Sequence, residues 1–206
     1  MPIRCVIGLG NPGSEYAETR HNIGFMVIEG LGERYRAKLK LGKGSFYLGK
    51  ANIKGDVVLL AVPTTYMNRS GIAVRRIVEQ EGLRPEEILV VLDDFDLPFG
   101  WLRIRKSGSA GSHNGLTDII DRLGTKDIPR LRVGIGEPPA GIDPADFVLS
   151  RFSPEERKDL PNVLADCMSA VEIAVRDGID RAMNVHNRKK DEEANGSKGY
   201  GPTTEE

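Results

Sequence analysis

The sequence has few of the residues and segments on which several protein classes depend. Among its 206 residues are two cysteines, three histidines and one tryptophan. No run of eighteen apolar residues and no basic segment followed by an apolar one at the N-terminus is present, so we expect neither a membrane span nor an export signal, and a cytoplasmic protein. Cys5 and Cys167 lie in apolar segments far apart in the chain, which favours buried reduced thiols over a disulfide.

An excess of charge of either sign is also missing. Twenty-nine basic and thirty acidic residues give a net charge of -1, which argues against binding to nucleic acid by bulk charge alone. Residues 101–136 depart from this balance, because they contain seven Lys or Arg and three Asp. A local basic patch of this kind positions phosphates and reads no bases. For Arg103 and Lys106 a solvated surface is the alternative interpretation.

Strand and helix patterns alternate along the chain, and turns rich in glycine separate them. Residues 88–92 are apolar at every position, which is typical of a central strand covered on both faces. We expect one α/β domain over residues 1–188, a mixed twisted sheet with central parallel strands and helices on both faces. The polar segment 189–206 cannot repay its ordering entropy and is expected to be disordered. The expected strands are 3–7, 46–53, 56–62, 88–92 and 130–135, with a short hairpin around 97–105; the expected helices are 23–35, 72–80, 116–123, 153–176 and 179–188, and a loop covers 136–144.

Three common kinds of site fit the sequence poorly. Residues 8–13 match the GxGxxG pattern of dinucleotide-binding folds, but Pro12 removes a backbone N–H that a pyrophosphate would use, and the residues after Gly13 are polar. Residues 107–111 lack the first glycine of the serine-hydrolase turn. The three histidines have no spacing typical of a metal site, so we expect no metal.

What remains is a set of polar residues at the ends of expected strands, where open α/β sheets bind their ligands. His21 suits a general base at neutral pH, and the carboxylate of Asp93 could hold its second ring nitrogen. Asn11, Asn68 and Asn114 could donate to a carbonyl oxygen that becomes negative in the transition state. Such a set can activate water. Taken one at a time, the same residues also fit helix caps and turns.

Four blocks of this sequence resemble the bacterial-type peptidyl-tRNA hydrolases, in order and over residues 3 to about 188. They are 8–13 with Tyr16 and 19–22, then 63–71, then 93–98, and finally 112–116. The resemblance implies a monomeric cytoplasmic enzyme that cleaves the ester between a peptide and the 3' end of tRNA, without metal or cofactor. A non-catalytic RNA-binding protein of the same fold and a nucleotide-dependent enzyme are the alternatives.

The resemblance also implies roles for particular residues. The catalytic base falls on His21 and its supporting carboxylate on Asp93, while Asn11 falls on the residue that distinguishes blocked substrates from free aminoacyl-tRNA. Two basic residues, Arg105 and Arg132, fall on a clamp for the 5' phosphate of the tRNA. The remaining substrate- or tRNA-contacting positions fall on Tyr16, Tyr66, Asn68, His113 and Asn114.

Overall fold

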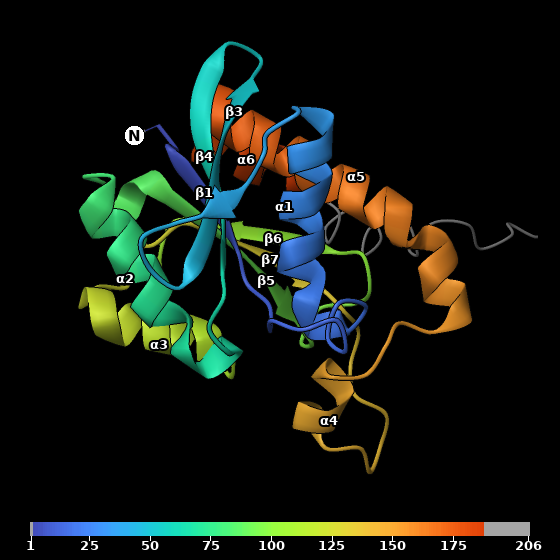
Figure 1. Cartoon of the computed structure of the whole chain (residues 1–206). Helices are drawn as coiled ribbons and strands as arrows, with labels where there is room; N and C mark the ends of the chain where they lie inside the picture. The colour runs from blue at the N-terminus through green and yellow to red at the C-terminus, as the bar shows by residue number, and fades with distance from the viewer. Residues whose placement is uncertain (1, 188–206) are drawn as a thin grey trace, which may run out of the picture.

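The computed structural model describes residues 2–187 and shows one α/β domain on a seven-stranded mixed sheet (Figure 1). The strands are β1 (Cys5–Gly8), β2 (Lys40–Leu41), β3 (Phe46–Ile53), β4 (Asp56–Pro63), β5 (Ile88–Asp94), β6 (Leu102–Arg105) and β7 (Arg130–Gly134). The helices are α1 (Ile23–Arg34), α2 (Ser70–Gln80), α3 (Asn114–Leu123), α4 (Pro144–Val148), α5 (Pro154–Arg176) and α6 (Ile179–His186), with short 3-10 helices η1 (Arg20–Asn22), η2 (Met67–Arg69) and η3 (Pro85–Glu87). The segment expected to be disordered, 189–206, lies outside the described residues.

The sheet confirms the predicted fold class. Its strand order is β2-β3-β4-β1-β5-β7-β6, in which β4, β1, β5 and β7 run parallel and form the centre. Antiparallel pairs extend it at both edges, from β4 to β3 and β2 and from β7 to β6. Every residue of β5 is buried, as a strand covered on both faces requires.

Helices cover both faces of the sheet, and each face has its own apolar core. α1, α5 and α6 cover one face, where their apolar side chains meet Val6 and Val91. α2 and α3 lie together on the other face, over Ile7 and Val90 (Figure 1). Successive residues of one strand enter different cores because side chains alternate across a pleated sheet.

The expected hairpin around residues 97–105 is wrong. Of that segment only β6 is a strand, and it pairs with β7, which lies beyond α3 in the chain, instead of with a strand next to it. The residues before β6 form a turn that docks on the end of β7: the Gly100 N–H donates to the carbonyl oxygen of Gly134, and the Gly134 N–H donates to that of Trp101. The local pattern showed a strand and a turn but not the distant partner. β2 and α4 were not expected either, because each has five residues or fewer.

Glycine at two positions lets β1 and α1 touch backbone to backbone. A Cβ at Gly24 would lie 2.5 Å from the carbonyl oxygen of Val91 and from the amide nitrogen of Leu9. Gly8, directly opposite, has no room for a side chain either. The first glycine of the GxGxxG match therefore serves helix packing, and it brings η1, just before α1, against the carboxyl ends of the central strands.

The residue before His21 ties η1 to the C-terminal part of the chain. Arg20 donates two hydrogen bonds to the carboxylate of Glu156, at 2.8 and 2.7 Å, and one to the carbonyl oxygen of Ile135. Its guanidinium also lies over the rings of Phe147 and Phe152. Because only 8 % of the Arg20 side chain and 21 % of the Glu156 side chain are exposed, this is a largely buried pair.

Replacing Glu156 by Gln is expected to lower the free energy of unfolding by about 3 kcal/mol at pH 7, since a buried cation loses its carboxylate. Burial alone would raise the pKa of Glu156, but the hydrogen bonds and the charge of Arg20 outweigh it and lower the pKa. The contribution is therefore complete above the ordinary glutamate pKa of about 4.3 and disappears as the pH falls through the lowered value. Denaturant unfolding of both proteins at pH 7 and pH 3 measures this. Glu155→Gln, an exposed neighbour, is the matched control, and equal losses in both variants would contradict the assignment.

Candidate active site

The predicted site residues come together at the carboxyl ends of the parallel strands β1, β4 and β5. Asn11 follows β1, Asp93 is the second-last residue of β5, and η2 with Asn68 follows β4. β1 and β4 are neighbours in the sheet. The chain runs from β1 to α1 on one face and from β4 to α2 on the other face. That arrangement opens a crevice in doubly wound folds.

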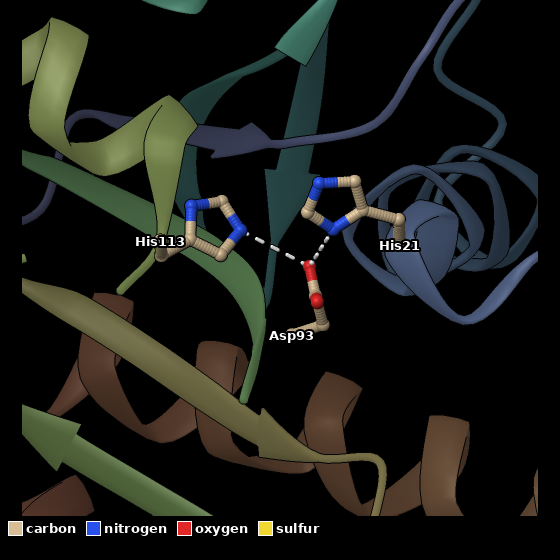
Figure 2. A group of neighbouring side chains, drawn as sticks. All are labelled: His21, Asp93 and His113. Carbon is tan, nitrogen blue, oxygen red and sulfur yellow. Dashed lines mark hydrogen bonds and ion pairs between the residues drawn. The ribbon is translucent and has the colours of Figure 1, made fainter. Parts of the chain in front are cut away.

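Asp93 accepts hydrogen bonds from two histidines on one oxygen. His21 Nδ1 lies 2.8 Å and His113 Nε2 lies 3.1 Å from Asp93 Oδ1 (Figure 2). The ring centroids are 5.2 Å apart. All three groups are withdrawn from solvent, with Asp93 2 %, His113 7 % and His21 9 % exposed.

The hydrogen-bond partners determine where each imidazole carries its proton. The backbone N–H of Leu116 donates to His113 Nδ1 at 3.2 Å, so the ring caps α3 and holds its proton on Nε2, facing Asp93. The carboxylate is an acceptor, so His21 holds its proton on Nδ1. Among residues 2–187 no group is hydrogen-bonded to Nε2 of His21, which is left as an acceptor on the side of the ring away from Asp93 (Figure 2).

The carboxyl group of Asp93 is held in its charged form. Burial alone would raise its pKa, but the attraction of His113 whenever that ring is protonated, together with the hydrogen bonds from His113 and His21, outweighs burial and holds the pKa well below its usual range. A negative charge next to His21 therefore persists at neutral pH, where it can stabilise an imidazolium on that ring.

The same three residues have the composition of a metal site. Their ligand atoms all lie within 4.8 Å of one another, although the spacing of the histidines in the sequence predicts no such cluster. Only the folding of the chain brings His113 next to His21 and Asp93. A metal on its Nε2 would move the ring proton to Nδ1, where it would face the N–H of Leu116. The donors and acceptors around the cluster therefore suit protons shared with a carboxylate better than a metal ion.

Asn11 is held in place by three hydrogen bonds. The side chain of Asn22 accepts from the Asn11 backbone N–H at 2.8 Å and donates to the Asn11 carbonyl oxygen at 2.9 Å. The backbone N–H of Met67 donates to Asn11 Oδ1 at 2.8 Å. Asn22 is 2 % exposed and follows His21 directly. The loop after β1 and the histidine are thus locked to each other.

His21 lies between two cavities of different chemistry. One, of about 320 Å³, is lined by charged and ionisable groups that include Asp93, Asp94, His113 and Arg132. The other, of about 540 Å³, is lined mainly by neutral polar groups and short apolar side chains; its polar lining includes Asn11, Tyr16, Tyr66, Asn68 and Asn114. His21 and Asn114 line both. We call the second space the amide cavity. Of the predicted site residues only Arg105 lines neither.

The predicted clamp residues differ in their surroundings. Arg103 lies opposite Arg132 and Arg105 opposite Arg130 across β6 and β7, so all four share one face. Arg105 is exposed, whereas Arg132 forms an ion pair with Asp94 at 3.1 Å. Arg130 is buried and donates to four carbonyl oxygens, among them those of residues 108 and 109, and burial lowers its pKa to about 10.

Sequence reasoning missed two residues that shape this site. Asn22 and Arg20 both lie in the block 19–22 that carried the family resemblance, yet neither was among the predicted site residues. Their partners are Asn11, 11 residues away, and Glu156, 136 residues away. A polar residue inside a matched block and next to the expected base was the available signal.

Comparisons with known proteins agree with this geometry. The family model described as peptidyl-tRNA hydrolase matches residues 5–194. Peptidyl-tRNA hydrolase of Chloroflexus aurantiacus is 49% identical over 88% of this chain and 97% of its own length, and that of Aquifex aeolicus is 46% identical over 92% and 98%. The crystal structure of peptidyl-tRNA hydrolase from Acinetobacter baumannii is 38% identical, with a TM-score of 0.85 over 90% of this chain and 95% of that one. Among residues 2–187 no helix is long and apolar enough to cross a membrane. The chain belongs to the peptidyl-tRNA hydrolase family.

Proposed function

We propose that this protein hydrolyses the ester that joins a peptide to the 3' end of tRNA, with water activated by His21. The observation that carries the proposal is the arrangement of His21, whose Nδ1 is bound to a buried carboxylate while Nε2 remains a free acceptor beside the amide cavity. Family membership supports the substrate. The sequence-based expectations of a monomer, of a cytoplasmic location and of a reaction without metal or cofactor are part of the proposal.

In this mechanism His21 Nε2 takes a proton from water while the water oxygen bonds to the ester carbonyl carbon. The resulting imidazolium lies 2.8 Å from Asp93, which favours its charge. The carbonyl oxygen becomes negative, and amide N–H groups lining the amide cavity stabilise it. The ester bond to the ribose oxygen then breaks, and the imidazolium returns its proton to that oxygen. The products are free tRNA and a peptide acid.

The direct test uses N-acetylphenylalanyl-tRNA, a small blocked substrate. We expect release of N-acetylphenylalanine in proportion to enzyme concentration. Binding of the tRNA without any release would favour the alternative, a non-catalytic RNA-binding protein of the same fold. That alternative gives no reason for the paired imidazoles on Asp93. The nucleotide-dependent alternative is disfavoured because Gly8 serves helix packing.

Arg105 and Arg132 are proposed to hold the 5' phosphate of the tRNA. Replacing both by Ala is expected to raise KM for a full tRNA substrate and to lower the slope of log KM against log salt by about one for each phosphate that is no longer neutralised. A short substrate that lacks the 5' phosphate should be affected little. Arg122→Ala, which removes an arginine paired with Asp118 on α3, is the control. Equal losses of activity on both substrates would remove the clamp from the proposal.

A further inference from the structure

A run of basic residues crosses the β2–β3 edge of the sheet, away from the site described above. Residues 34–54 contain seven Lys or Arg and no Asp or Glu, a more one-sided composition than that of residues 101–136. Four of the seven share an ion pair or a groove with carboxylates of α1 or α5: Arg34, Arg36, Lys38 and Lys54. The other three, Lys40, Lys43 and Lys50, are exposed, and none of them forms an ion pair within residues 2–187.

The strand register brings two of these lysines to one face of the sheet. Lys40 is opposite Leu48 in the β2–β3 ladder, and Lys50 is two residues further along β3, so both side chains leave the sheet on the face of Leu48. Leu48 packs against the core beneath α2 and α3. Diagonal neighbours of this kind lie about 7 to 8 Å apart, so the two positive charges repel each other.

The loop after β2 adds two more cations on the side of α2. Gln80 Nε2, on α2, donates to the carbonyl oxygen of Lys43 at 2.7 Å, and Arg76 Nε lies 3.5 Å from the same oxygen. The loop is thereby held against α2, with Arg76 beside it. Glu79 pairs with Arg76 at 4.0 Å, but its closer partner is Arg75, at 2.8 Å. We call the following four residues the β2–β3 basic surface: Lys40, Lys43, Lys50 and Arg76.

A surface of this kind favours a polyanion as its ligand. Cations that the carboxylates of the protein do not balance attract counterions, and a polyanion that replaces these counterions releases them into solution, which strengthens binding. We propose that the β2–β3 basic surface binds RNA through its phosphates, without reading bases. The choice of RNA over another polyanion rests on the proposed function, which already brings tRNA to this protein.

The position of this surface separates it from the proposed clamp. β2 and β6 are the two edge strands of the seven-stranded sheet, about 30 Å apart at about 4.8 Å per strand, and Arg105 lies on β6. One terminal phosphate cannot reach both. The phosphates at the β2–β3 basic surface therefore belong to the body of the same tRNA or to a separate RNA, and both sources present the same chemistry.

An anionic membrane is another large polyanion, and the strand register argues against it. The exposed large apolar side chains of β2 and β3 are Leu41 and Tyr47, which are 67 % and 43 % exposed and lie opposite each other in the ladder. They leave the face opposite to Lys40 and Lys50, because side chains alternate across a strand. A segment that lies on a membrane combines a basic face with an apolar one that enters the headgroups. Here the apolar pair and the lysines cannot meet one flat surface together, which favours RNA.

Replacing Lys40, Lys43 and Lys50 together by Gln tests the surface. The background is the clamp-free protein, Arg105→Ala with Arg132→Ala, and the probe is a short RNA duplex with 5' hydroxyl ends and no acyl group. We expect Kd for the duplex to rise about tenfold or more. The slope of log Kd against log salt should fall by about two to three, one for each phosphate that is no longer neutralised.

The matched control replaces Arg157, Lys158 and Arg181 by Gln, which removes the same charge from exposed positions on α5 and α6. It should bind the duplex like the clamp-free protein. An equal effect of both triple replacements, or no effect of the first, would overturn the assignment. So would a lysine variant that loses binding to phosphatidylserine vesicles and keeps its duplex binding. If the clamp-free protein does not fold, the same replacements in the wild-type protein decide through the same two quantities.

Hydrolysis of N-acetylphenylalanyl-tRNA identifies which RNA the surface holds. In the otherwise wild-type protein the three lysine replacements should leave kcat unchanged. A raised KM assigns the surface to the body of the substrate tRNA, whereas an unchanged KM together with weaker duplex binding assigns it to a separate RNA, and both results support the proposal. If the wild-type protein cleaves no ester, the proposed function fails, while duplex binding still decides whether this surface binds RNA.

Discussion

Replacing His21 by Ala is expected to lower kcat for N-acetylphenylalanyl-tRNA by about 10² to 10⁴, the usual contribution of a positioned general base. That range corresponds to about 3 to 5 kcal/mol of activation free energy. KM should change little, because the tRNA contacts do not depend on the imidazole and the asparagines and tyrosines that line the amide cavity remain. The loss should appear in kcat, since proton removal from water occurs only in the transition state.

The measurement is a steady-state rate comparison with thermal unfolding as a check on folding. His186→Ala is the matched control, because His186 is at the end of α6 and lines neither cavity next to His21. A His21→Ala protein that binds substrate and turns it over at nearly the wild-type rate would reject the imidazole as the base. A loss seen in KM alone would instead assign His21 to binding.

The sequence predicted the residues of this site better than the contacts that orient them. Asn11 and Asp93 could be named because each follows an expected strand, and parallel strands bring their carboxyl ends to one edge. The roles of His21, Asp93 and Asn11 then followed from the family resemblance of the blocks that contain them. The tautomers could not be named, because they depend on the cap that His113 makes with Leu116. The orientation of Asn11 likewise depends on the backbone of Met67, 56 residues away.

In the fold too, features set by residues close together in the sequence were predicted, and those set by contacts between distant residues were not. The capping box at Ser153 and Glu156 and the turn at residues 54–55 are local, and the predicted helix and hairpin are confirmed there. β6 was predicted with the wrong partner because pairing with β7 depends on a contact across a whole helix. Glu156 illustrates both levels, since its carboxylate accepts the backbone N–H of Ser153 at the start of α5 and also accepts hydrogen bonds from Arg20, the residue before the base.

Asp93→Asn is expected to lower kcat by about 10² to 10⁴ and to leave KM nearly unchanged. The amide can accept the two histidine N–H groups only through its oxygen, and it brings no charge to stabilise an imidazolium on His21. An amide turned the other way would place N–H groups against both rings and favour the wrong tautomer of His21, the effect that makes such replacements severe in hydrolases with a His–Asp pair.

The pKa of Asp93 separates this charge effect from ordinary acid inactivation. Because that pKa is held below its usual range, the carboxylate is charged from the ordinary aspartate pKa of about 3.9 upward, and its contribution is lost only as the pH falls further. A fall in wild-type rate between pH 8 and pH 5 therefore reports a different group, and the deficit of Asp93→Asn should persist at the pH where the wild type is fastest. Asp96→Asn, the same change on an exposed neighbour, should match the wild type throughout. If Asp93→Asn recovered full activity at any pH in this range, its charge would not be what supports the base, and hydrogen bonding alone would explain its place beside His21.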